Sequence, residues 1–148
     1  RTFPFDLVIL LWGSLTLGLL LDKSGLADVI ANGILSMTDG YHPVLGLITL
    51  FMVTWILTEF LSNNSAALAA FPIALALATR LSLPAEAYVL AVAFGASASF
   101  LIPFGYQTHL MVLTPGKYRF SDFLSLGVVV FLFYGAASMT TISLLYLR

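Results

Sequence analysis

The chain has 148 residues, of which 60% are hydrophobic and only 9% are charged, whereas a soluble protein carries roughly 25% charged residues, so an integral membrane protein is predicted. Six Lys and Arg stand against seven Asp and Glu, and the resulting net charge of −1, without a basic stripe, argues against nucleic acid as a partner. The absence of cysteine excludes a disulfide framework and a thiolate metal site.

The first apolar segment covers residues 5–21. Its 17 residues are at the short end of what a membrane-spanning helix needs. It has no initiator Met before it and no small-residue cleavage site of a signal peptide. We therefore expect this chain to be part of a larger protein of the plasma or bacterial inner membrane that extends before Arg1.

The next segment, LADVIANGILSM, is too short and too polar to span a membrane. Its apolar residues recur at helical spacing, which predicts a helix lying at the membrane interface: Leu26, Val29, Ile30, Gly33 and Ile34. The Asp-Gly pair and the proline of TDGYHP, residues 38–43, then predict a turn.

Two apolar stretches joined by a polar tip occupy the centre of the chain. They cover residues 44–61 and residues 65 to about 81, and the second contains Pro72, which a membrane helix tolerates because its neighbours satisfy the freed backbone groups. The tip between them, SNNS at residues 62–65, predicts a helical hairpin. Either both arms cross the membrane and the tip faces solvent, or the hairpin is re-entrant and its tip lies near the midplane. The modest length of the second arm favours the re-entrant form.

A second interruption follows the hairpin. Residues 86–100, EAYVLAVAFGASASF, predict a helix whose small residues let a neighbouring helix approach closely. The sequence PFGYQTH at residues 103–109 then breaks the apolar pattern, which resumes only briefly as LMVL. Apolar segments interrupted by Gly and Pro are the best sequence indicator of a transporter binding site.

The last part of the chain is a polar loop and a long apolar segment. The loop PGKYRFSD, residues 115–122, carries Lys117 and Arg119, and the positive-inside rule places it in the cytoplasm. Residues 123–147 predict the final membrane helix. The expected organisation is all-α and has three parts, which are a transmembrane helix with the interfacial helix (1–41), a transport segment (42–115, with the hairpin at 42–81 and a broken helix at 85–114), and the loop with the last helix (116–148).

Interrupted helices offer backbone groups to ions. Carbonyl groups at a helix C-terminus attract cations, and N–H groups at a helix N-terminus attract anions. The carbonyls near Thr58 and Leu61 and the first amides of the second arm point to one place, so a sodium ion and an anionic substrate could be held there together. The second interruption, at residues 103–109, also offers a helix C-terminus and a helix N-terminus.

Glu59 and His109 leave other interpretations open. An acidic residue in a membrane segment is a candidate for function, although it could equally be a structural acceptor that ties the hairpin down. A lone His is more often a hydrogen-bonded structural residue than a proton carrier. Together the two side chains could serve a proton-coupled antiporter or a channel. A third alternative is a structural membrane subunit whose SNNS tip is a plain helix cap in solvent.

Two motifs resemble a known transporter family. TEFLSNNSAA, followed about 40 residues later by FLIPFGYQTHLMVLTPGKYRFSDF, resembles the C-terminal half of the divalent anion:sodium symporters, the solute carrier 13 group. The likeness covers essentially the whole chain and is greatest to the branch that carries cytoplasmic TrkA-C domains. It implies a homodimeric carrier of the elevator type, built from inverted repeats that each contain a re-entrant hairpin with a Ser-Asn-Thr tip and a discontinuous transmembrane helix. It also implies that the N-terminal half, with the rest of the site, is missing here, so this chain should not transport alone.

The resemblance assigns roles to individual residues. Ser62 and Asn63 match the first two positions of the tip motif, and Asn64 stands where Thr is usual. The implied sodium ligands are Thr58, Leu61, Ser62, Asn63 and Gly105. The implied anion-binding residues are Ser62, Asn63, Asn64, Tyr106, Gln107 and Thr108.

The expected function is secondary active transport, with sodium-coupled symport of a small divalent anion. Because Asn64 and the GYQTH interruption depart from the dicarboxylate carriers, both sulfate and a dicarboxylate are candidates. The sequence shows no metal-ligand spacing, nucleophile elbow or phosphate-binding loop, so we do not expect an enzyme. We expect no cofactor beyond Na⁺ as the coupling ion.

Overall fold

A computed structural model describes residues 8–147, apart from residues 10–11, 14–15, 17–18, 21–22, 38–41 and 104. This part of the chain forms helices and connecting segments and contains no strand. The helix predicted for residues 5–21 and the turn predicted at 38–43 lie largely outside the described residues. The helices that are described, in chain order, are α2 (Leu26–Met37), α3 (Pro43–Phe60), α4 (Asn63–Leu81), α5 (Ala85–Ala96), α6 (Gln107–Leu113) and α7 (Phe120–Tyr146).

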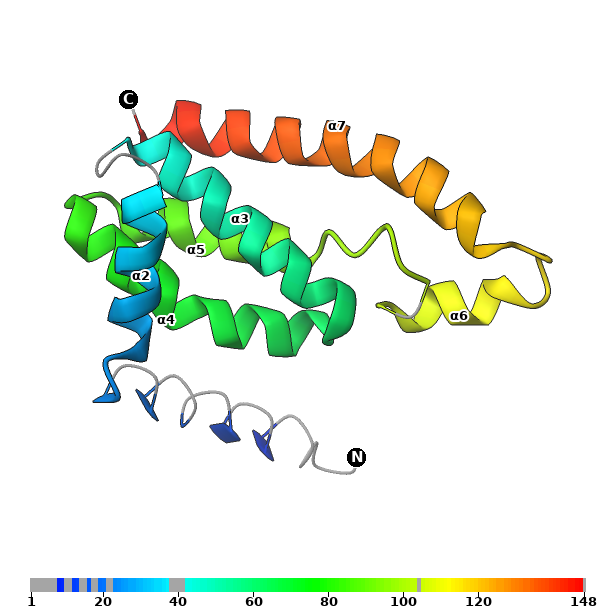
Figure 1. Cartoon of the computed structure of the whole chain (residues 1–148), viewed down its shortest axis with the longest axis horizontal. Coiled ribbons are helices and arrows are strands. Elements are labelled where there is room, and N and C mark those ends of the chain that lie inside the picture. Colours follow the sequence, from blue (N-terminus) through cyan, green and yellow to red (C-terminus); the bar gives the residue numbers. More distant parts are fainter. Residues whose placement is uncertain are drawn as a thin grey trace.

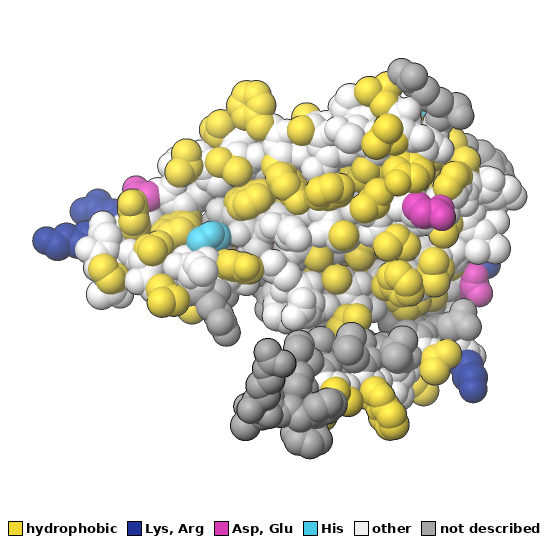
Figure 2. Space-filling model, turned by 180° about the vertical axis from the view of Figure 1, so that it is seen from behind, with side chains coloured by type: hydrophobic (Ala, Val, Ile, Leu, Met, Phe, Trp, Pro, Cys, Tyr) yellow, Lys and Arg dark blue, Asp and Glu magenta, His cyan; other side chains and the backbone are white. Residues whose placement is uncertain are grey.

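Three of these helices, α3, α4 and α7, are long and apolar enough to cross a membrane. Even the shortest, α3 with 18 residues, extends about 27 Å. Their outer faces carry large exposed apolar side chains, such as Phe133 on α7, which is 75% exposed. Figure 2 shows apolar side chains spread over one face of the molecule, with Lys and Arg confined to its margins. These features confirm the predicted all-α polytopic membrane fold.

The predicted hairpin is formed by α3 and α4, which pack against each other and are joined at a tip on the side of α6 (Figure 1). Helix α3 begins at Pro43, where the missing N–H costs nothing, and ends at Phe60, after which the backbone is extended. Ser62 caps α4, because its Oγ accepts a hydrogen bond of 3.2 Å from Ser65 N. Helix α4 therefore begins at Asn63 rather than at Ser65 as predicted, and both tip asparagines lie in its first turn.

Helix α5 packs against both arms of the hairpin and against α7. Small side chains make this close packing possible, since Ala66, Ala70, Ala87 and Ala91 are fully buried. Tyr88 is also fully buried, and its hydroxyl donates a hydrogen bond of 3.1 Å to Pro43 O at the start of α3. The core of the described chain thus lies between α3, α4 and α5.

Gly95 sets the distance between α5 and α3, which gives a first prediction. A Cβ at Gly95 would lie 2.9 Å from Phe51 O and 3.0 Å from Thr54 Cβ, both closer than a contact allows. We expect Gly95→Ala to lower the free energy of unfolding by about 1–3 kcal/mol, seen as a lower thermal midpoint of the full-length protein. Gly46→Ala is the control, because its Cβ would make an ordinary 3.5 Å contact with Leu81. Equal midpoints for the two variants would contradict the packing argument.

Helix α2 forms as predicted and packs against the hairpin. Its buried residues against the hairpin are Ala27, Ala31 and Ile34, whereas Leu26 and Val29 are exposed. The small alanines allow a close approach that the larger apolar residues do not. An ion pair that the sequence analysis did not foresee, with 2.7 Å between Arg80 Nη2 and Asp28 Oδ1, joins α2 to the end of α4. The interfacial position of α2 stays a prediction.

The segment between α5 and α6, residues 97–106, is irregular and is called the break below (Figure 1). The sequence analysis predicted a helix to residue 100, and this boundary is wrong because α5 ends at Ala96. The predicted start of the last helix at residue 123 is also too late. Asp122 accepts a 2.7 Å hydrogen bond from Arg119 N, and α7 begins at Phe120. The division of the chain into three functional parts stays a prediction.

Candidate functional site

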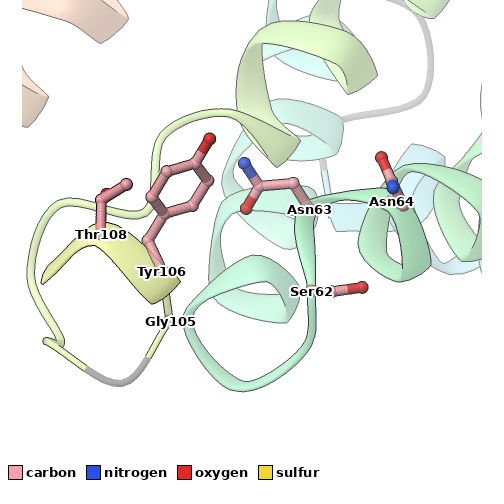
Figure 3. Close-up of a pocket in the computed structure, with 6 residues that line it drawn as sticks. All are labelled: Ser62, Asn63, Asn64, Gly105, Tyr106 and Thr108. Atoms are coloured by element: carbon pink, nitrogen blue, oxygen red, sulfur yellow. The ribbon is translucent and has the colours of Figure 1, made fainter. Parts of the chain in front are cut away.

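The hairpin tip and the break line one pocket, of about 370 Å³ (Figure 3). In the close-up, the carboxamide of Asn63 points toward the segment that carries Tyr106, whereas the side chain of Ser62 points away from it. None of the lining residues that the structure describes is charged. They are Ser62, Asn63 and Asn64 from the tip side and Gly105, Tyr106 and Thr108 from the break side.

Three predicted site residues, Thr58, Leu61 and Gln107, are not among the described residues that line the pocket. Thr58 is fully buried in the last turn of α3. Leu61 is the residue that follows α3, and its side chain is not among those that line the pocket. Gln107 is the first residue of α6, and its side chain lies outside the described part of the chain. The structure thus brings together six of the nine residues predicted for the two sites and places Thr58 next to them.

Thr58 connects the tip to the end of α5. Its Oγ1 lies 2.7 Å from Ala96 O and 2.9 Å from Asn63 Oδ1, but a hydroxyl has only one proton to donate. The shorter contact assigns that proton to Ala96 O. Turning the Asn63 carboxamide by half a turn would then let its Nδ2 donate to Thr58 Oγ1, so that all three groups are satisfied. Asn63 is held in place by this contact.

The last carbonyl groups of α3 face the break. Leu57 O accepts a 2.9 Å hydrogen bond from Leu61 N, but within the described chain no hydrogen bond reaches Thr58 O or Glu59 O. A Cβ at Gly105 would lie 3.3 Å and 3.4 Å from these two oxygens, so the backbone of the break approaches the end of α3 closely. Such free carbonyls are the groups with which broken helices bind Na⁺.

The first amides of α4 are the second set of backbone groups near the tip. Ser65 N and Ala66 N donate to Ser62, to its Oγ at 3.2 Å and its carbonyl oxygen at 2.9 Å. No acceptor within the described residues pairs with Asn63 N or Asn64 N. Within the described residues, the tip therefore carries unpaired carbonyls at the end of α3 and unpaired amides at the start of α4; that both point to one place stays a prediction.

Glu59 anchors the break, a role that the sequence analysis left open as one of two possibilities for this residue. Its side chain is buried, with Oε1 accepting from Leu101 N at 3.2 Å and from Trp55 Nε1 at 3.0 Å, and Oε2 accepting from Ile102 N at 3.0 Å. The carboxylate therefore fixes two backbone amides of the break to α3. It ties down the break rather than the hairpin itself.

His109 is not connected to Glu59 by any hydrogen bond that the structure describes. Its ring lies between aromatic neighbours, with centroids 5.9 Å from Tyr106 and 5.4 Å from Phe123. Its Nδ1 is buried and has no hydrogen-bond partner within the described residues. The geometry thus gives no direct path for a proton between Glu59 and His109.

Gly127 of α7, which the sequence analysis did not single out, holds the break from the opposite side. A Cβ there would overlap Phe100 O and lie 3.2 Å from Leu101 Cα. The break is therefore packed between α3 and α7. A glycine inside a long apolar helix was the available sequence signal for this close approach, although the same helix also contains Gly135.

Comparison with known proteins places this geometry in a family context. The chain matches the citrate transporter family over residues 1–148. It is 37% identical over 143 residues to an uncharacterized transporter of Synechocystis (96% of this chain, 23% of the relative) and 32% identical over 146 residues to the uncharacterized transporter YfbS of Escherichia coli (99% and 24%). It is 36% identical over 108 residues to sodium/sulfate cotransporter 2 of Chlamydomonas reinhardtii (72% and 12%). The chain spans about a quarter or less of the length of these relatives.

Proposed function

We propose that this chain, which belongs to the citrate transporter family, forms part of a secondary transporter that moves a small divalent anion together with sodium. The relatives named sodium/sulfate cotransporters support sodium and a sulfate-type anion as the transported pair. The names of the family and of these relatives indicate a transporter rather than an enzyme. The observation that carries the proposal is the single pocket that the hairpin tip and the break line together.

The chemistry of the pocket favours coupling to a cation. The six lining residues that the structure describes are neutral, so no Lys or Arg among them offsets the charge of a bound dianion. Burying an uncompensated charge is costly. In our proposal Na⁺ bound at the free carbonyls of α3 supplies part of the compensation, and the amides that begin α4 supply the rest. Anion affinity then depends on Na⁺, and the reverse holds to the same degree.

The proposed ligands follow from this arrangement. Thr58, Ser62, Asn63 and Gly105 hold Na⁺, with the backbone of Leu61 completing the set. The anion is bound by hydrogen-bond donors of the tip and of the break, namely Ser62, Asn63, Asn64, Tyr106, Gln107 and Thr108. Both sulfate and a dicarboxylate present oxygen acceptors to such donors.

The complete transporter needs more than this chain. Because the relatives are several times longer, we propose that another half supplies a second hairpin, a first sodium site and the rest of the anion site. We further propose that the hairpin is re-entrant, and that the protein works as a homodimer in the plasma or inner membrane. In this scheme the transport segment moves as an elevator against the flanking helices. Membership of the branch with TrkA-C domains belongs to the same proposal.

A sodium-replacement assay tests the proposal. In proteoliposomes that contain the full-length protein, replacing external Na⁺ by choline is expected to lower labelled sulfate or succinate uptake by roughly tenfold or more, since couplings between bound ligands are commonly 5- to 150-fold. Competition between unlabelled sulfate and succinate then identifies the preferred anion. Uptake that persists in choline and instead follows the pH gradient would contradict sodium coupling and favour a proton-coupled carrier.

A further inference from the structure

Ser99, within the break, has a buried oxygen without a partner. The residue is 4% exposed, and its Oγ makes no hydrogen bond to any described residue. Ser97, two residues earlier, is exposed and donates to Ala93 O at 2.9 Å, as serines near a helix end commonly do. A buried hydroxyl that stays unpaired is costly, so Ser99 calls for an explanation.

The oxygen of Ser99 faces the free end of α3 across Gly105. A Cβ at Gly105 would overlap Ser99 Oγ and would lie 3.3 Å from Thr58 O and 3.4 Å from Glu59 O. Apart from Gly105 and its chain neighbours, these three oxygens are the atoms nearest to that point. A hydroxyl and two carbonyls without hydrogen-bond donors therefore lie close to one point beside Gly105, where the absence of a Cβ lets Ser99 Oγ approach.

Neighbouring contacts hold Ser99 in this position. Directly after Phe100, the amides of Leu101 and Ile102 donate to the carboxylate of Glu59. Gly127 of α7 lets the backbone at Phe100 pack closely against that helix. The hydroxyl is thus preorganised between two fixed points, which is what a ligand for an ion requires.

We propose that Ser99 Oγ is an additional ligand of the coupling cation and strengthens its binding at the end of α3. Neutral carbonyl and hydroxyl oxygens are hard ligands suited to an alkali cation, which they bind in place of its hydration shell. The cation would remove the cost of the unpaired hydroxyl and of the two free carbonyls at once. This inference rests on the proposed sodium coupling and adds to it a residue that determines cation affinity.

The test measures Na⁺ binding without transport. Purified full-length protein is melted while tryptophan fluorescence is followed, with NaCl exchanged for choline chloride at constant ionic strength, because a ligand that binds only the folded state stabilises it by RT ln(1 + [L]/Kd). Fitting the midpoint against Na⁺ concentration with this relation gives Kd, which in Ser99→Ala should rise about 5- to 10-fold, with little change of the midpoint in choline alone. Ser99→Cys keeps the size of the side chain but presents a soft sulfur, and should show the same shift.

Ser97→Ala is the matched control and should keep the wild-type Na⁺ dependence, because its hydroxyl is already paired at the surface. In proteoliposomes, Ser99→Ala should raise the half-saturating Na⁺ concentration by the same factor and keep the maximal rate at saturating Na⁺. Unchanged Na⁺ dependence in both Ser99 variants overturns the inference. So does a lower midpoint in choline with an unshifted Na⁺ response, which would assign Ser99 to packing or to a buried water. If the wild type responds to Na⁺ in neither assay, the proposed function fails as well.

Discussion

Replacing Asn63 by Ala in the full-length protein is expected to lower sodium-driven anion uptake by about 10- to 100-fold, because a hydrogen bond to a charged group contributes about 1.5–3 kcal/mol. The Asn63 carboxamide points toward the segment that carries Tyr106 and contacts Thr58 Oγ1 at 2.9 Å. Its loss therefore removes a group that belongs to both the proposed Na⁺ site and the proposed anion site. Alanine is the best helix former, and the first turn of α4 should persist. Uptake is compared at equal amounts of protein in the membrane.

The control for Asn63 is Asn32→Ala, the same chemical change at an exposed position of α2, far from the tip in sequence and absent from the pocket lining. It should leave uptake unchanged. Asn63→Ala should also raise the half-saturating concentrations of both Na⁺ and the anion, since the residue belongs to both proposed ligand sets. Normal uptake by Asn63→Ala would remove the tip from the proposed site.

The long elements could be predicted from the sequence for a physical reason. Helices α3, α4 and α7 are apolar stretches bounded by polar or cap-forming residues, and each lies within three residues of its predicted bounds. The sequence contains two interrupted apolar segments. Polar groups in a membrane protein need partners in the protein, in water or in a ligand, so the tip and the break could be expected to line one pocket. The roles of the individual pocket residues stay predictions.

Other features depend on contacts that no local pattern contains. The residues after Ala96 are Ser97, Ala98 and Ser99, which a helix accommodates, yet α5 ends there and the following backbone is held by Glu59 from 40 residues earlier. The face that α2 buries, which the sequence analysis did not specify, combines Ile34 with Ala27 and Ala31, because close packing favours small side chains. The helix starts at Asn63 and Phe120 are set instead by local caps, in which Ser65 N donates to Ser62 Oγ and Arg119 N donates to Asp122 Oδ2. Tertiary contacts override local preference at the end of α5.

The second large effect concerns Glu59. Replacing it by Ala leaves the amides of Leu101 and Ile102 and the indole N–H of Trp55 without their acceptor. At about 1–3 kcal/mol for each unpaired buried donor, the loss should be at least about 3 kcal/mol. We expect a strongly lowered thermal midpoint of the full-length protein and uptake close to background, because the break would no longer be fixed beside the tip.

Glu59→Gln separates anchoring from proton transfer. The amide oxygen can take the place of Oε1 and accept from Leu101 N and Trp55 Nε1, but the new NH₂ group then faces Ile102 N, donor against donor. An anchor predicts a midpoint between those of Ala and wild type, partial uptake, and an unchanged pH dependence. Glu86→Gln, at an exposed position in the first turn of α5, is the control and should match the wild type. A Glu59→Gln protein that melts like the wild type but has lost both uptake and its response to pH would instead make Glu59 a proton carrier.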